Sequence, residues 1–172
     1  MKTFRIFMLM LLAGTVVLSS CKKDDEDDNN DNNNNNNNNN TTYVMSAMVD
    51  NENWGSNTVV GIIDGTSEVT VTAVSTDNTS SMVLSIYDFT GEGEYLVTDD
   101  TDNSAYYTVV GSTSAWFAPF GTQATGTITI TSFADNKITG TFSFTGINML
   151  SGTNTIKVIS SGTFTNVTLQ TQ

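Results

Sequence analysis

Apolar and hydroxyl-bearing residues alternate strictly along two neighbouring stretches of the chain, residues 127–130 and 137–144. A period of two residues is typical of a β-strand with one buried face and one solvated face, as in antiparallel sheets. The pattern therefore predicts two strands whose apolar side chains face a core, namely Ile128, Ile130, Ile138, Phe142 and Phe144.

The length of the connection between these two strands decides how they pair. A three-residue loop over residues 135–137 sets Ile130 opposite Phe142, so that both apolar faces lie on the same side. A two-residue turn over residues 135–136 sets Ile130 opposite Thr141 and turns one strand over. We therefore expect the three-residue loop.

The rest of residues 41–172 has the composition of a sheet protein, with 27 threonines, 13 valines and 9 isoleucines against 2 lysines and no arginine. Turn residues separate further candidate strands, which we expect at 43–50, 58–63, 68–75, 82–87, 94–98, 105–111 and 156–167. The sequence predicts an all-β fold: a single antiparallel β-sandwich or flattened closed barrel of about 8–10 strands, following a disordered linker.

The beginning of the chain has the layout of a secretory signal peptide. Lys2 and Arg5 give it a positive start, residues 6–18 are apolar and uncharged, and small residues follow. The apolar run is shorter than the roughly 20 residues that a membrane-spanning helix needs.

A cysteine stands directly after those small residues, in the order Leu18-Ser19-Ser20-Cys21. This order resembles the lipobox of bacterial lipoproteins. The resemblance implies that residues 1–20 are removed and that Cys21 carries the lipid. Membrane attachment through more than one acyl chain is stable, whereas a single chain binds only marginally.

Residues 22–40 follow with two lysines, six acidic residues, eleven asparagines and no apolar side chain. Such a segment cannot bury enough surface to offset the entropy of ordering, so we expect residues 21–40 to form a lipidated, disordered linker before the β domain of residues 41–172. Its start, Cys21-Lys22-Lys23-Asp24-Asp25-Glu26, is similar to the lipoprotein export signal of Bacteroidota. That similarity implies the outer membrane and its exterior face, with the periplasmic leaflet as the alternative.

Charge and residue content exclude several classes of function. Once the signal segment is removed, four basic residues face 18 acidic residues, which gives a net charge of −14 and makes nucleic acid an unsuitable partner. The chain has no histidine, and its one cysteine is assigned to the lipid. Histidine-dependent nucleophilic triads and the usual zinc sites are thereby removed, so we expect a noncatalytic protein without a cofactor.

Several short segments of the β domain carry a further resemblance. They are Ala47-Met48-Val49-Asp50, Trp54, Gly93-Glu94-Tyr95, Gly126-Thr127-Ile128-Thr129-Ile130, residues 138–144 and residues 161–167. Together they resemble a domain of unknown function found in Bacteroidota lipoproteins. The resemblance implies location and fold, and it brings no catalytic or binding residues.

Two groups of residues are weak candidates for a site. Asp99, Asp100, Asp102 and Asn103 cluster oxygen ligands of the kind that calcium uses, although a solvated acidic turn explains them as well. Trp116 and Phe117, with Tyr106 and Tyr107 nearby in sequence, are aromatic candidates for a ligand, although core packing explains them as well. One of the two tyrosines should face outward if their segment is a regular strand.

Two functions follow from these observations. The first is a membrane-anchored, surface-exposed lipoprotein whose noncatalytic β domain serves an interaction or structural role, with a glycan or protein as a partner. The alternative is a binding module for a glycan or small ligand, and a hydrolase using carboxylates such as Glu92 and Glu94 ranks last. An interior packed shut favours the first, and an open pocket or outward aromatic row favours the second.

Overall fold

The computed structural model describes residues 42–148 and 154–172, and their regular structure is entirely β. The signal segment, the linker and Cys21 lie outside the described residues. The eleven strands are β1 Met45–Val49, β2 Glu52–Ser56, β3 Thr58–Ile63, β4 Val69–Val74, β5 Ser80–Ile86, β6 Gly93–Val97, β7 Ser104–Val109, β8 Ala115–Ala118, β9 Gly126–Ala134, β10 Lys137–Asn148 and β11 Thr155–Thr171. A search of the described residues finds no helix long and apolar enough to cross a membrane.

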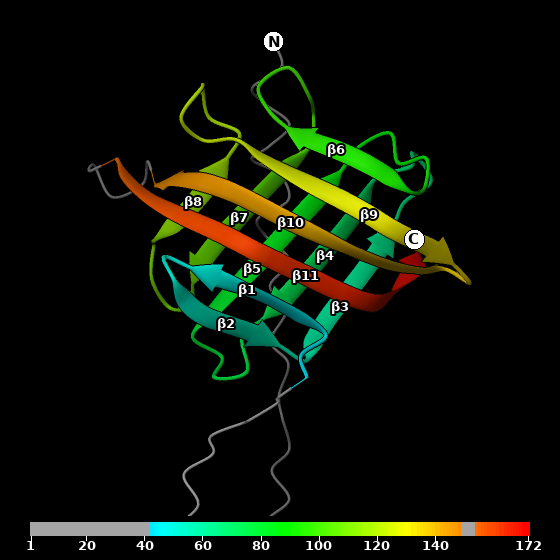
Figure 1. Ribbon diagram of the computed structural model, residues 1–172, viewed down its shortest axis with the longest axis horizontal. Coiled ribbons are helices and arrows are strands. Elements are labelled where there is room, and N and C mark those ends of the chain that lie inside the picture. The colour runs from blue at the N-terminus through cyan, green and yellow to red at the C-terminus, as the bar shows by residue number, and fades with distance from the viewer. Residues whose placement is uncertain (1–41, 149–153) are drawn as a thin grey trace, which may run out of the picture. The chain divides into compact units, whose positions relative to one another are not determined.

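All eleven strands belong to one sheet in the order β2-β1-β11-β3-β4-β5-β7-β8-β10-β9-β6, and β10 also pairs with β11. Figure 1 shows this sheet folded into two facing layers whose strands cross, with β3, β4, β5, β7 and β8 behind the other six. The all-β prediction is confirmed. The strands number eleven instead of the expected eight to ten, and the pairing departs from antiparallel once, because β11 runs parallel to β3.

Apolar side chains fill the space between the two layers. All five residues that the alternation assigned to the core are at most 3% exposed, so that prediction is confirmed. The rings of Phe142 and Phe164 stack with their centroids 6.3 Å apart. Each large buried side chain contributes about 1.5–3 kcal/mol relative to an exposed one, so this interior stabilises the fold.

The connection between β9 and β10 differs from the expected loop. Ala134 pairs with Lys137, so the turn has only two residues, Asp135 and Asn136, both with left-handed φ angles of 51° and 57°. The prediction of a three-residue loop is therefore wrong. Two-residue hairpin turns with positive φ suit the twist of the flanking strands.

A β-bulge keeps the apolar faces of β9 and β10 aligned despite that short turn. Thr139 pairs with Ser132 but Gly140 pairs with Ile130, which leaves Thr131 as an extra residue on β9. Because the bulge shifts the register by one residue, Ile130 is not set opposite a threonine, and its side chain stays in the core.

Glycines allow β9, β10 and β11 to pack closely. A Cβ atom at Gly162 would lie 2.5 Å from the Phe142 carbonyl oxygen, and one at Gly140 would overlap the Thr129 carbonyl oxygen. Real Cβ atoms do not approach so closely, so these positions accept only glycine without movement of a neighbour.

Two strands were absent from the sequence prediction. The turn before β2 contains only Asp50 and Asn51, with φ angles of 50° and 69°. The residues from Glu52 onward are therefore free to pair with β1 and form a strand. β8 pairs with β7, and its Phe117 meets Ile147 of β10. β8 thus connects the back layer to the front layer.

Candidate functional site

The predicted calcium ligands lie in the loop between β6 and β7. Its three aspartates, residues 99, 100 and 102, are exposed, but Asn103 is buried. The Asn103 Oδ1 accepts a hydrogen bond from the Tyr87 amide at 2.8 Å, and its Nδ2 donates to the Leu96 carbonyl at 2.8 Å. Within the described part of the chain, no group of three or more His, Cys, Asp or Glu residues is arranged to hold a metal ion. Calcium binding at this loop therefore stays a prediction from the sequence pattern.

The four aromatic candidates divide into two pairs on opposite faces of the sheet. Tyr107 and Trp116 are cross-strand partners in the core, each 9% exposed, with ring centroids 5.9 Å apart. Tyr106 and Phe117 are partners on the outer face, half-buried, with centroids 5.6 Å apart. Burial raises the pKa of Tyr106. The expectation that one tyrosine faces outward is confirmed for Tyr106.

Tyr106 and Phe117 belong to an apolar row on the outer face. The row consists of successive cross-strand partners on β5, β7, β8, β10 and β11: Val83, Tyr106, Phe117, Ile147 and Ile156. Ile147 is buried at 4% exposure, while Ile156 is 52% exposed. Neighbouring members therefore cover one another, and only the β11 end of the row is largely open to solvent.

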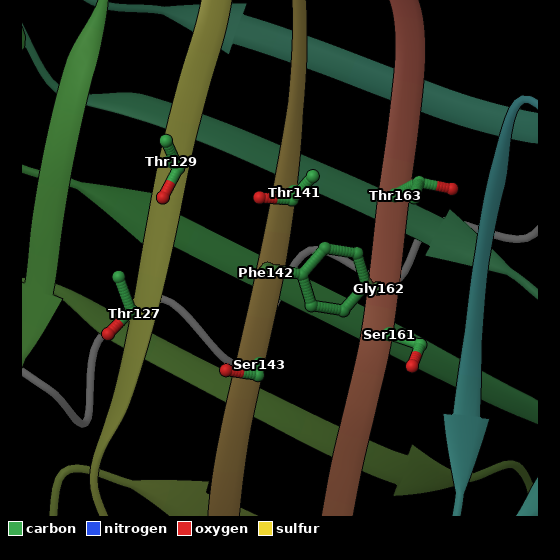
Figure 2. Close-up of a pocket in the computed structure, with 8 residues that line it drawn as sticks. All are labelled: Thr127, Thr129, Thr141, Phe142, Ser143, Ser161, Gly162 and Thr163. Carbon is green, nitrogen blue, oxygen red and sulfur yellow. The ribbon is translucent and has the colours of Figure 1, made fainter.

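Hydroxyl groups cover the outer face of β9, β10 and β11. Figure 2 shows Thr127, Thr129, Thr141, Ser143 and Thr163 around a hollow of about 400 Å³, with Phe142 and Gly162 at its floor. Thr129 pairs with Thr141, and Thr141 pairs with Thr163, so these hydroxyls form a row across the three strands. The hollow is shallow and open, and no charged residue lines it.

A second hollow, which we call the recess, is more enclosed and has a volume of about 380 Å³. It lies among β1, β2, the β4–β5 turn, β7 and the start of β11. Its lining includes both charged and aromatic side chains, among them Tyr43, Asp50, Glu52, Trp54, Asp77, Tyr107 and Lys157. Neither Glu92 nor Glu94, the carboxylates considered for catalysis, lines either hollow.

Asp50 and Lys157 form an ion pair at the edge of the recess. Lys157 Nζ donates to Asp50 Oδ2 at 2.7 Å, and the Val158 amide donates to Asp50 Oδ1 at 2.9 Å. Burial acts to raise the pKa of Asp50, but these hydrogen bonds and the Lys157 charge outweigh it, so the pKa lies below its usual value. Asp50 therefore remains a carboxylate near neutral pH.

Two aromatic rings also lie close to the Lys157 ammonium group. Its Nζ lies 5.0 Å from the centroid of Trp116 and 5.9 Å from that of Tyr107. Cation–π contacts of this kind add about 0.5–1 kcal/mol at exposed sites. The carboxylate and the two rings together fix the position of the ammonium group at the recess.

Asp77 lines the recess from the turn between β4 and β5. Its Oδ1 accepts hydrogen bonds from the Ser75 hydroxyl at 2.6 Å, the Thr79 amide at 3.1 Å and the Thr79 hydroxyl at 2.9 Å. The Ser75 hydroxyl and then the Thr79 groups lower the pKa of Asp77. Nearby, Trp54 Nε1 donates to Ser80 Oγ at 2.9 Å, which fixes the indole ring.

The recess was not predicted from the sequence. Asp50 ends one expected strand and Asp77 lies between two others, at positions where Asp is common, and Lys157 contributed only to the net charge. The local sequence gives no usable signal, because a single lysine between Ile156 and Val158 would be placed on the solvent face by the strand period. In the structure Ile156 and Val158 are instead about half exposed, and Lys157 lies on the opposite face.

Comparison with protein families gives one match. A family model described as a domain of unknown function, DUF6252, matches residues 35–168. Neither the curated proteins nor the solved structures contain a match to this chain.

Proposed function

Since the chain belongs to the family of domains of unknown function that matches residues 35–168, we propose a function from its own residues. We propose that the protein is a lipoprotein held in the outer membrane by lipid on Cys21, with its β domain facing the cell exterior. The domain serves there as a noncatalytic contact unit.

The filled interior is the observation that carries the noncatalytic role. Large side chains such as Phe142, Phe144 and Phe164 occupy the space between the layers, each at most 3% exposed. Both hollows described above lie at the surface, and the carboxylates Glu92 and Glu94 line neither of them. A contact function needs only surface, whereas a catalytic function needs reacting groups brought together around a substrate.

The anchoring proposal rests on Leu18-Ser19-Ser20-Cys21 and is tested by labelling. Cells that produce the full chain are grown with radioactive palmitate, and the wild-type protein is expected to carry label and to fractionate with membranes. The Cys21→Ser variant keeps the size of the side chain and is expected to lose both the label and the membrane association. Equal labelling of the two proteins contradicts the proposal.

The outward orientation has a separate test. Intact cells are treated with protease, and the β domain is expected to disappear while a periplasmic marker protein remains. A β domain that survives on intact cells, yet is degraded once the outer membrane is permeabilised, supports the periplasmic leaflet instead.

A further inference from the structure

We infer that the recess is a binding site for a neutral sugar residue. It is concave, its volume of about 380 Å³ is within the usual range for small-ligand sites, and it combines hydrogen-bond acceptors, donors and aromatic side chains. The inference adds a ligand class to the contact function proposed above. It does not depend on how the protein is attached to a membrane.

Carboxylates provide the acceptors for sugar hydroxyl groups. All three hydrogen bonds to Asp77 within the described residues end on Oδ1, so Oδ2 remains available. Glu52 is exposed, and among the described contacts its side chain makes no hydrogen bond and no ion pair. A carboxylate can accept bonds from two adjacent hydroxyls, and such charge-assisted bonds are the stronger kind.

Lys157 and Asn53 provide the donors. The Lys157 ammonium has three protons, and one of them serves Asp50. The exposed Asn53 lines the recess between Glu52 and Trp54, and its amide group can both donate and accept. A sugar hydroxyl is itself donor and acceptor, so a wall with both kinds of group matches it.

Tyr43 provides an apolar wall. Its ring packs against Gly55, where an added Cβ atom would lie 2.5 Å from the ring carbon Cδ2. The ring is half-buried and lines the recess beside Trp54, which is 7% exposed. The C–H face of a sugar ring packs well on an aromatic side chain of this kind.

The charges of the recess exclude anionic ligands. The Asp50 carboxylate is neutralised by Lys157, but Glu52 and Asp77 have no cationic partner among the described residues. An acidic sugar would bring a third charge of the same sign, and like charges brought together at close range are costly. A neutral sugar satisfies the acceptors without that repulsion.

The test uses the full chain, solubilised in a detergent that contains no sugar. Glucose, galactose, mannose and N-acetylglucosamine serve as neutral probes, with glucuronate as the anionic probe. Saturation-transfer NMR reports contact, and the fluorescence of the two tryptophans, Trp54 in the recess wall and Trp116 beside Lys157, reports occupancy. At least one neutral sugar is expected to bind, and glucuronate is expected to bind more weakly.

Two variants assign the binding to the recess. Asp77→Asn keeps the Oδ1 acceptor of the turn but replaces Oδ2, and it is expected to weaken binding about tenfold. The matched control is Asp64→Asn, because Asp64 Oδ1 accepts from Thr66 and Glu68 in the β3–β4 turn in the same manner, outside the recess. Glu52→Gln, which changes only an exposed side chain, is expected to weaken binding as well.

Three outcomes overturn the inference. The first is that no neutral sugar binds, and the second is that glucuronate binds as well as the neutral probes. The third is that Asp77→Asn and Glu52→Gln bind like Asp64→Asn. If Tyr106→Ala loses sugar binding while the recess variants bind normally, the sugar site lies on the outer apolar row instead. None of these results changes the palmitate labelling of Cys21, so failure here is distinguishable from failure of the anchor.

Discussion

Lys157 pairs with Asp50 and also lies against the rings of Trp116 and Tyr107. Its side chain is 24% exposed and that of Asp50 is 44% exposed, so solvent screens the pair. An ion pair of this exposure contributes at most about 1 kcal/mol. Its role is therefore to hold β11 against the β1–β2 turn and to position a donor.

Replacing Lys157 by methionine tests this pair through pH. Because the pKa of Asp50 is lowered in the folded protein, its contribution is present above the unfolded value of 3.8 and is lost as the pH falls through the folded value. At pH 7 we expect Lys157→Met to lower the free energy of unfolding by about 1 kcal/mol. The difference from wild type is expected to shrink below about pH 4.

Urea unfolding at a series of pH values measures that difference. Lys137→Met is the control, because Lys137 is exposed in the β9–β10 hairpin and takes part in no ion pair of the described residues. A Lys157→Met deficit that stays constant from pH 7 to the acid limit would show that the ion pair is not its source.

A second prediction concerns the close approach of β9, β10 and β11. Alanine at Gly140 places a Cβ atom against the Thr129 carbonyl and 2.6 Å from Phe164 Cζ, so backbone or ring has to move. We expect Gly140→Ala to lower the free energy of unfolding by about 1–3 kcal/mol. Gly65→Ala is the control, because nothing lies within 4 Å of the added Cβ atom there. Equal unfolding midpoints in urea for the two variants contradict the prediction.

At the scale of the elements, the alternation of residues predicted strands and faces more reliably than pairing. Ile128, Ile130 and Phe142 are buried as expected, because burial of one face follows directly from a period of two. The register was predicted wrongly, because a turn and a bulge each shift it by one residue and their effects combine. Thr131, the extra residue, is one more threonine in a threonine-rich strand, and nothing in the sequence marks it.

Strand β8 and the recess were missed in the sequence-based prediction for the same physical reason. β8 is only four residues long, Ala115–Ala118, and its pairing partners are set by the crossing of the two layers. The recess brings together Asp50, Asp77 and Lys157 from three separate parts of the chain. Local patterns carry no information on such contacts, so neither feature was predicted.

Deleting Thr131 tests the role of the bulge. Without this extra residue, a regular strand after the same two-residue turn keeps Ile130 opposite Gly140 and Ile128 opposite Phe142, so the apolar face of β9 still lies in the core. We therefore expect the deletion variant to retain cooperative thermal unfolding. Thr131→Ala keeps the residue count and removes only a hydrogen bond to the Thr139 carbonyl, so a loss of about 1 kcal/mol or less is expected. Loss of cooperative unfolding in the deletion variant contradicts this prediction.

At the scale of the whole molecule, acidic residues far outnumber basic ones. Residues 42–172 contain 12 acidic residues and 2 lysines. Most of the carboxylates lie in turns and loops, while the hydroxyl-covered face in Figure 2 has none. Self-repulsion among these carboxylates opposes the compact state.

Salt should therefore stabilise the domain. Raising sodium chloride from roughly 10 mM to roughly 500 mM shortens the screening length, and we expect the melting temperature to rise by roughly 2–5 °C. Calorimetry at a series of sodium chloride concentrations measures the shift. A melting temperature that is unchanged or lower in salt contradicts the expectation.

The position of β11 in the sheet also determines when the fold can be completed. This single strand pairs with β1, β3 and β10, so it joins the earliest strands of the sequence to the latest ones. The β1–β2 hairpin pairs with the rest of the sheet through β11 alone. The first hairpin can therefore join the sheet only once β11 is in place, and this pairing closes a loop of more than 100 residues, which is intrinsically slow.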